Sequence, residues 1–297
     1  FYRLKNIITH ITGFDKFLPT HQGRAAERIL FEILGGSGKI IPNNFHFDTT
    51  RANIEYSGAK ALDLVIDEGL DPLSLHPFKG NLDPKKLREC FETHGKENIP
   101  VVMITVTNNS GGGQPVSLKN IEEIRKICDE YQTPLFLDAC RFAENAMFIK
   151  KREKGYEDWT IKDIVKKMFD LVDGATFSAK KDAIANIGGF LLIRDSELFE
   201  KAKNLLILSE GFITYGGLAG RDLEAIAQGL IEVLSENYLT YRLRFVEYIG
   251  EKLLKEGIQI IQPTGGHALY IDAKAFYPHI PKEQFPGQVL ACELYLN

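Results

Sequence analysis

The sequence lacks the features that mark membrane proteins, disulfide-stabilised proteins and nucleic-acid-binding proteins. No apolar run approaches the roughly 20 residues needed to cross a bilayer. The 36 basic and 40 acidic residues leave a net charge of −4, which gives no positive field for nucleic acid or for an anionic membrane. The four cysteines include no CxxC pair, so we expect reduced thiols in a cytoplasmic protein rather than disulfides or a zinc site.

Several common catalytic motifs are also absent. The glycines at 111–113 lack the GKS/T ending of a P-loop and do not fit GxGxxG, so the sequence gives no indication of nucleotide binding. There is no GxSxG elbow of a serine hydrolase, and the seven histidines form no metal-ligand spacing. A phosphorylated ligand would therefore have to be bound by a local cluster of side chains.

The residues that are present predict a globular α/β fold. At 297 residues, 44% of them hydrophobic, the chain can bury a large core without metals or disulfides. Short apolar runs alternate with amphipathic stretches, which indicates βα units around a mostly parallel sheet. The predicted strands are 39–41, 61–65, 101–105, 135–138, 174–178 and 189–193, and the predicted helices are 23–34, 84–94, 118–131, 161–169, 196–208, 220–236 and 238–256.

After residue 256 the pattern changes. Residues 258–261 and 268–271 are expected to form two strands around a Gly265-Gly266 turn, followed by a proline-punctuated loop and a terminal helix. A boundary inside the long helical region divides the chain into a large domain, 1–236, and the start of a small C-terminal domain, 237–297, which we expect to be incomplete.

Two lysines directly follow one of the predicted strands, in the segment Ser178-Ala179-Lys180-Lys181-Asp182. Open α/β sheets bind ligands at the carboxyl ends of their strands, and a shielded lysine amine beside another cation can form a Schiff base. Ser178 and Lys180 are candidates to bind a phosphate. Taken by itself, this segment is equally typical of a solvent-exposed turn.

An aspartate ends another predicted strand. Burial of the Asp138 carboxylate is costly unless it is paired, and pairing with a surface arginine is a common solution. Asp138 lies 43 residues before Lys181, with one helical stretch and one strand between them, which places both at neighbouring strand ends. An aspartate there can hold a pyridine nitrogen protonated, which makes the ring an electron sink.

Two further segments can complete such a site. Gln22, Gly23 and Arg24 open a predicted helix, whose free N–H groups favour an anion. In residues 45–51, alternation puts Phe45 and Phe47 on one side and His46 and Asp48 on the other. This indicates an edge strand, or an aromatic platform beside a substrate-facing polar residue. Asn109, in the glycine-rich loop after the strand 101–105, is a candidate donor to a ring oxygen.

Together the motifs THQGR, FHFDTTR, NSGGGQPVS, LDACRFAENA and FSAKKD and the run 211–217 resemble the β-eliminating lyases, the family of tryptophanase and tyrosine phenol-lyase. The resemblance extends over residues 1–297. It implies the aspartate-aminotransferase-like fold type I of pyridoxal-phosphate (PLP)-dependent enzymes, with a mainly parallel seven-stranded sheet in the large domain and a smaller α/β domain.

The resemblance also implies roles for single residues. Lys181 matches the Schiff-base lysine, and Asp138 matches the partner of the pyridine nitrogen. Arg141 and Asn109 match residues beside the phenolic oxygen of the cofactor, and Phe47 matches the ring stacked on it. The phosphate site matches Gln22, Gly23, Arg24, Ser178 and Lys180, the carbonyl of Asn186 matches a position of a monovalent-cation (K⁺) site, and the family's tetramers imply a homo-oligomer.

The substrate is expected to be an aromatic L-amino acid. Asp48, directly after Phe47, is similar to tryptophanases and favours cleavage of L-tryptophan to indole, pyruvate and ammonia, with Lys181 as general base and Asp48 engaging the indole N–H. Residues 186–190 look more like tyrosine phenol-lyase, which remains an alternative. The resemblance places the family's N-terminal arm and carboxylate-binding arginines outside these 297 residues. A second alternative is therefore an inactive homologue that binds the cofactor.

Overall fold

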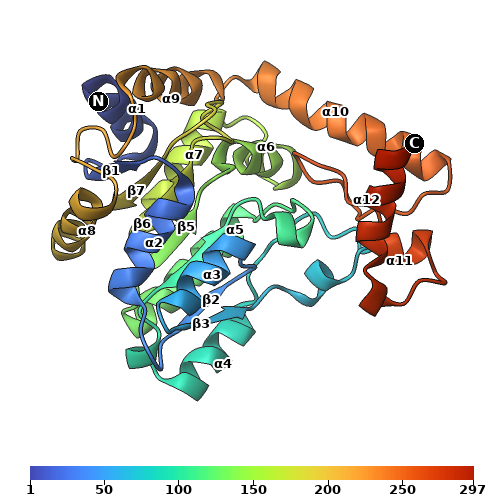
Figure 1. Cartoon of the computed structure of the whole chain (residues 1–297), viewed down its shortest axis with the longest axis horizontal. Helices are drawn as coiled ribbons and strands as arrows, with labels where there is room; N and C mark the ends of the chain where they lie inside the picture. Colours follow the sequence, from blue (N-terminus) through green and yellow to red (C-terminus); the bar gives the residue numbers. More distant parts are fainter.

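The centre of the molecule is a five-stranded sheet (Figure 1), and the computed structural model describes all residues from 1 to 297. The sheet consists, in spatial order, of β1 (Phe17–Thr20), β7 (Gly189–Ile193), β6 (Gly174–Ser178), β5 (Leu135–Asp138) and β4 (Val102–Thr105). Strands β4, β5 and β6 are parallel, and β7 is antiparallel to both of its neighbours. The parallel strands therefore end at one edge, where the site residues are expected.

A smaller sheet pairs β2 (Ile40–Asn43) with β3 (Lys60–Asp63) in parallel. Side-chain groups join it to β4. Asn43 Nδ2 donates to Thr105 Oγ1 at 2.9 Å, Asn44 Nδ2 donates to Thr105 O at 3.0 Å, and Thr105 N donates to Asn44 Oδ1 at 2.9 Å. The expected seven strands are present, but two buried asparagines replace the backbone ladder and divide the expected single sheet in two.

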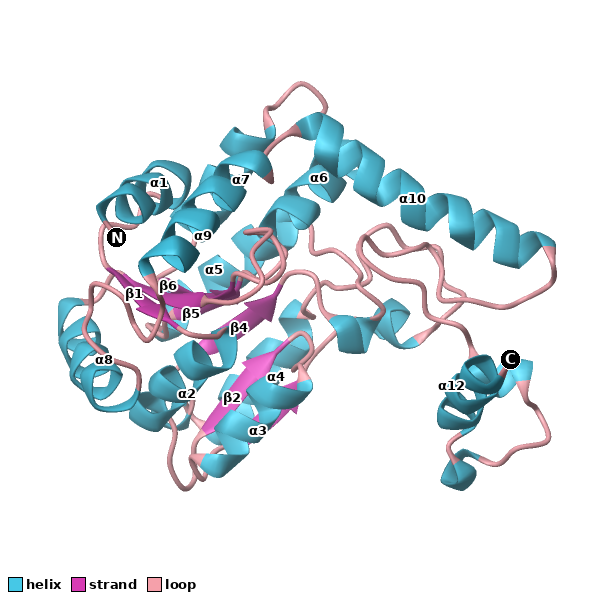
Figure 2. Cartoon of the chain, turned by 45° about the horizontal axis from the view of Figure 1, so that its top comes forward, coloured by secondary structure: helices cyan, strands magenta, loops and turns pink.

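Helices cover both faces of the sheets, and alternate strand residues face the two layers. In β4, Val102 and Ile104 belong to the core on one face and Met103 to the core on the other. Both faces of the strands are therefore buried, which explains their continuously apolar sequences. Six helices contribute to one core: α1 (Tyr2–Thr12), α4 (Pro84–His94), α5 (Leu118–Tyr131), α6 (Phe142–Arg152), α7 (Ile161–Asp170) and α9 (Gly220–Glu232). Three helices contribute to the other: α2 (Gly23–Leu34), α3 (Asp48–Tyr56) and α8 (Ser196–Ser209) (Figure 2).

The strand predicted for residues 45–51 does not form: Phe47 keeps an extended backbone, but the chain is helical from residue 48 onward. Phe47 is the N-cap of α3 and Asp48 is its first residue. An acidic side chain in the first turn lies at the positive end of the helix dipole, where it is stabilising, and Asp48 Oδ1 accepts a 2.5 Å hydrogen bond from Thr49 N. Elements α1, β1 and α6 were likewise not predicted.

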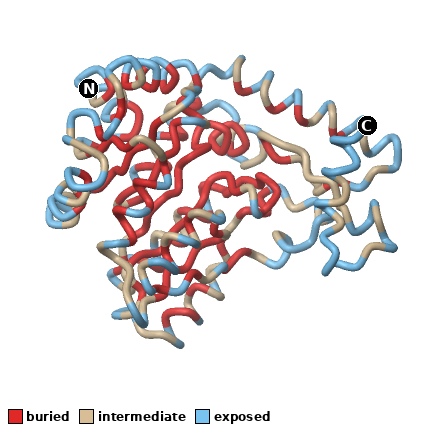
Figure 3. Tube along the Cα trace, in the orientation of Figure 1, coloured by how far each residue is buried: buried red, intermediate tan, exposed pale blue.

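The C-terminal part contains α10 (Glu236–Lys255), α11 (Ala273–Phe276) and α12 (Pro286–Leu296), and much of it is exposed (Figure 3). No helix combines the length and the apolar character needed to cross a membrane. The helices α9 and α10 are separated at residues 233–235, beside the predicted domain boundary, which stays a prediction.

The two strands predicted around Gly265-Gly266 are reduced to a single antiparallel bridge between Ile260 and Ile271. Backbone groups of this segment bind elsewhere. Lys79 Nζ donates to Gln262 O at 2.7 Å, and Gln114 Nε2 donates to the carbonyl of the next residue at 2.6 Å. Two backbone hydrogen bonds flank the bridge, from Ile261 N to Tyr270 O and from Asp272 N to Gln259 O, and the ladder extends no further.

Candidate active site

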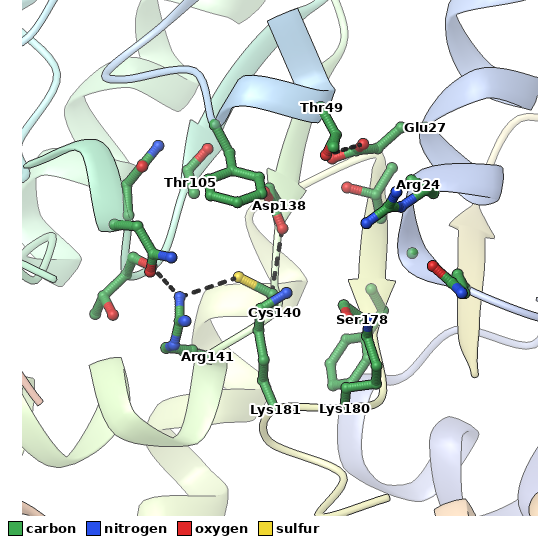
Figure 4. A pocket seen from close by; sticks show the side chains of 18 residues that line it. Arg24, Glu27, Thr49, Thr105, Asp138, Cys140, Arg141, Ser178, Lys180 and Lys181 are labelled. Atoms are coloured by element: carbon green, nitrogen blue, oxygen red, sulfur yellow. Dashed lines mark hydrogen bonds between the residues drawn. The ribbon is translucent and has the colours of Figure 1, made fainter. Parts of the chain in front are cut away.

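A cavity of about 300 Å³ lies where β4, β5 and β6 end and α2 begins (Figure 4). Polar side chains at or after the ends of β1, β2, β4, β5 and β6 converge on it, because the carboxyl ends of parallel strands share one edge of the sheet. All ten residues predicted to bind the cofactor line this cavity: Gln22, Gly23, Arg24, Phe47, Asn109, Asp138, Arg141, Ser178, Lys180 and Lys181.

One end of the cavity is suited to an anion. Gln22 is the N-cap of α2 and Gly23 its first residue, so the positive end of the helix faces the cavity together with the cationic side chains of Arg24 and Lys180. A Cβ on Gly23 would lie 2.8 Å from Ser178 Cβ. Glycine is therefore required for the helix to start this close to the end of β6.

The carboxylate of Asp138 lies on the opposite side. Its side chain is buried, and Oδ1 accepts a 3.4 Å hydrogen bond from Cys140 N. Burial raises the pKa of Asp138, while the positive charge of Lys181 acts in the opposite direction. A ligand that presents a protonated ring nitrogen would satisfy this carboxylate.

Lys181 and Asp138 line the same cavity, which is the geometric condition on which the lyase hypothesis depends. Figure 4 shows the Lys181 side chain extending toward Cys140 and Asp138. Lys181 is half-buried and its neighbour Lys180 is exposed. The structure therefore distinguishes the two lysines: the second reaches into the cavity and the first lies at its rim.

Between these ends, three buried polar atoms that line the cavity have no hydrogen-bond partner in the protein: Arg141 Nε, Asn109 Oδ1 and Thr176 Oγ1. Arg141 is held in place by a 3.0 Å hydrogen bond from Nη1 to Thr107 O. Unpaired buried polar groups are costly, so this wall fits a ligand with polar substituents on a flat ring. The residues present thus fit PLP.

Sequence reasoning missed Glu27, a buried carboxylate in the cavity wall. It accepts hydrogen bonds from Thr50 Oγ1 at 2.5 Å, Thr49 Oγ1 at 3.3 Å and Asn53 Nδ2 at 3.4 Å. Burial, with the charge of Asp138, raises the pKa of Glu27 to about 7. The sequence could have indicated this position: Glu27 follows Gly23 by four residues and therefore lies on the same face of the helix.

Two predicted site residues lie outside the cavity lining. Asp48 is exposed at the start of α3, next to Phe47, which does line the cavity. Asn186 is exposed in the loop before β7. No cluster of three or more His, Cys, Asp or Glu residues is placed to hold a metal ion. The substrate role of Asp48 and the cation role of the Asn186 carbonyl stay predictions.

The sequence matches one protein family over almost its whole length. The family model for β-eliminating lyases matches residues 1–291. The chain belongs to this family. It is 56% identical over 297 residues to the tryptophanase of Salinibacter ruber, covering all of this chain and 63% of that protein, and 55% identical over 295 residues to the tryptophanase of Rhodobacter capsulatus, covering 99% and 65%.

Other relatives of the chain are named tyrosine phenol-lyase rather than tryptophanase. The chain is 47% identical over its full length to the tyrosine phenol-lyase of Symbiobacterium thermophilum and covers 65% of it. The chain thus spans somewhat less than two thirds of the length of these curated relatives.

Solved structures confirm the fold. The complex of SepCysS with the N-terminal domain of SepCysE aligns with a TM-score of 0.64 at 15% identity, over 96% of this chain and 72% of that one. The serine palmitoyltransferase of Sphingomonas wittichii aligns with the same score at 12% identity, over 91% and 60%. The expected fold type I is therefore present, and family and fold together support PLP as the cofactor.

Proposed function

We propose that the cavity binds PLP and that the chain is the cofactor-binding part of a lyase that removes the side chain of an aromatic L-amino acid. The observation that carries the proposal is the convergence of Lys181, the buried Asp138 and the anion-binding start of α2 on one cavity. These groups match the aldehyde, the ring nitrogen and the phosphate of a single ligand.

Each end of the cavity would hold one part of the cofactor. The Lys181 amine would bind the aldehyde carbon, and Asp138 would hold a proton on the ring nitrogen. Arg141 and Asn109 would contact the ring oxygen with their unpaired buried atoms, and Phe47 would stack on the ring face. The phosphate would be bound by Gln22, Gly23, Arg24, Ser178 and Lys180.

PLP, when bound, supplies an electron sink for the bonds broken at the substrate. The chain's own residues then control protons. The Lys181 amine would act as general base for the proton on the substrate Cα. Asp138, buried beside Lys181, would hold a proton on the ring nitrogen of the bound cofactor.

L-Tryptophan is the proposed substrate, and indole, pyruvate and ammonia the products. Relatives named tryptophanase reach 56% identity, and Asp48 stands beside Phe47 at the start of α3, where its carboxylate can accept the indole N–H. L-Tyrosine is the alternative, since relatives named tyrosine phenol-lyase reach 47%. We further propose a cytoplasmic homotetramer with a K⁺ ion at the Asn186 carbonyl. The three buried free cysteines fit a reducing compartment.

Borohydride reduction followed by peptide mapping tests the cofactor assignment. The protein is incubated with PLP, reduced and digested, and the label is expected on Lys181. The variant Lys181→Arg should lose the label and Lys180→Arg should keep it. A label on Lys180, or on neither lysine, would contradict the assignment.

Product assays test the substrate. Release of indole from tryptophan, phenol from tyrosine and sulfide from cysteine is measured alongside pyruvate. We expect indole with equal pyruvate. Phenol alone would favour the tyrosine alternative, sulfide alone a cysteine lyase, and bound cofactor without any pyruvate an inactive homologue.

A further inference from the structure

Three charged side chains form a buried cluster next to the cavity, and no step of the proposed mechanism uses them. Asp182 and Glu144 have fully buried side chains, and Arg242 reaches them from α10 with 21% of its side chain exposed. Figure 1 shows α10 running from the sheet-bearing part toward the C-terminal part, past α6. We call Arg242, Asp182 and Glu144 the Arg242 cluster.

Asp182 ties the loop of Lys181 to the loop of Asp138. Its Oδ2 accepts the amide N–H groups of Ala143 at 2.8 Å and Glu144 at 3.1 Å, in the first turn of α6. Its own amide donates to Cys140 O at 3.2 Å. The backbone next to Lys181 is thus attached at three points to the segment that follows Asp138.

Glu144 extends the attachment to a third strand end. Its Oε1 accepts a 2.7 Å hydrogen bond from Thr107 Oγ1, in the loop after β4. Its Oε2 lies 3.2 Å from Arg242 Nη2, while Arg242 Nη1 lies 3.4 Å from Asp182 Oδ1. His267 Nδ1, at 3.4 Å from Glu144 Oε1, adds a contact from the C-terminal part. One guanidinium therefore bridges two carboxylates that hold the loops after β4, β5 and β6.

The charges explain why the bridge matters. Burial and the charge of Glu144 raise the pKa of Asp182 to about 6, and Arg242 opposes this rise. Without the guanidinium, two buried carboxylates would face each other uncompensated, a strongly destabilising arrangement. The planar, two-pronged guanidinium can contact both carboxylates at once, whereas the single ammonium of a lysine cannot do so in the same geometry.

We propose that Arg242 is a positioning residue that, through Asp182 and Glu144, fixes Lys181 relative to Asp138 and Arg141. The inference deepens the proposed function and rests on it for its catalytic meaning. Arg242 is not among the residues that line the cavity. It sets the distance between the amine and the carboxylate that must share one ring.

The test compares Arg242→Gln and Arg242→Lys with a matched control, Arg244→Gln. Arg244 lies on the same helix, but its ion pair with Glu251 is at the surface, with 53% of the arginine side chain exposed. Hydrogen exchange of the first-turn amides of α6 is measured on each protein without cofactor. We expect exchange about tenfold faster or more in Arg242→Gln, because the loss of a bond to a charged group approaches that factor, and no change in the control.

A second readout separates positioning from support of the fold. The PLP dissociation constant and the melting temperature are measured for the same proteins. Arg242→Lys keeps the charge, so its melting temperature should return to near the wild-type value, while its PLP affinity stays about threefold or more below wild type. Arg242→Gln should bind about tenfold or more weakly.

Unchanged exchange in Arg242→Gln, or full recovery of both readouts in Arg242→Lys, would overturn the inference. If Arg242→Gln does not fold, Asp182→Asn takes its place, since its side-chain oxygen can still accept the α6 amides while its charge is lost. There, unchanged PLP affinity would overturn the inference. Absence of a borohydride label on Lys181 in the wild-type protein would instead contradict the proposed function, and the exchange measurement would still decide whether Arg242 joins the loops.

Discussion

Replacement of Glu27 by glutamine should remove a large part of the pH dependence of stability. Glu27 is buried in the cavity wall beside Asp138. Glutamine has the same shape, and its oxygen can still accept the hydrogen bond from Thr50. The substitution removes the titration and leaves the packing unchanged, so the effect of the charge can be measured separately.

The sign follows from the raised pKa. Below about pH 4.5 Glu27 is protonated in both the folded and the unfolded chain, and its contribution to folding is fully present. Between pH 4.5 and about 7 the unfolded chain releases the proton while the folded chain retains it, so stability falls as the pH rises. The total loss is about 3 kcal/mol once the pH passes 7.

Urea unfolding of the cofactor-free protein at pH 5, 6, 7 and 8 checks this prediction. Glu27→Gln should equal the wild type within about 1 kcal/mol at pH 5 and exceed it by about 2–3 kcal/mol at pH 8. Glu32→Gln is the control, because Glu32 lies on the same helix with 53% of its side chain exposed, and its profile should follow the wild type. Parallel profiles for wild type and Glu27→Gln would refute the reasoning.

Three further substitutions test other parts of the site. Asp138→Asn should lower kcat roughly a hundredfold or more, because a full charge next to the ring nitrogen would be worth a few kcal/mol at an intermediate dielectric; a kcat within threefold of wild type would contradict its role. Gly23→Ala should weaken PLP binding about tenfold, measured by absorbance titration, since its Cβ would meet Ser178 Cβ at 2.8 Å. Asn44→Leu should destabilise the chain by about 1–3 kcal/mol in urea unfolding, because it leaves Thr105 N and O unpaired where the sheets join.

Local signals explain why much of the fold was predictable. The bounds of α2, α4 and α5 agree with the prediction at both ends, and α4 and α5 each begin at a residue whose side chain caps the helix. Asp83 accepts the amides of Lys85 and Lys86, and Ser117 accepts the amide of Asn120. Such caps act within one turn of helix, so they can be read from neighbouring residues.

Where the prediction failed, distant residues decide the structure. Asn43 and Asn44 bond to Thr105, about sixty residues away, and this pairing divides the sheet. Lys79 bonds to Gln262 O across 183 residues and ties the loop between the two expected strands to a distant part of the chain. Periodicity and propensity carry no information about such pairs, since each partner alone reads as an ordinary polar residue.

In the site, too, some residues are recognisable from the local sequence and others only from the folded chain. Asp138 and Lys181 were predicted to lie at the site because Asp138 ends one apolar strand and Lys181 lies three residues after another, positions at the ligand-binding edge of an open sheet. Glu144 and Arg242 have no such marker: one lies inside α6, the other inside α10, and only the folded chain brings them within 3.2 Å. The strand ends thus indicated residues of the cavity lining, whereas Glu144 and Arg242, which do not line it, have no such signal in the sequence.

The distribution of buried charge argues that folding and cofactor binding are coupled. Glu27 and Asp138 are buried side by side in the cavity wall, and burial raises the pKa of both. Each carboxylate therefore makes the cofactor-free chain less stable than an apolar wall would. A bound ring that presents a protonated nitrogen offsets this repulsion, and any ligand that binds only the folded state stabilises it by mass action. The carboxylates that destabilise the cofactor-free chain would then be the groups that favour a ring with a protonated nitrogen.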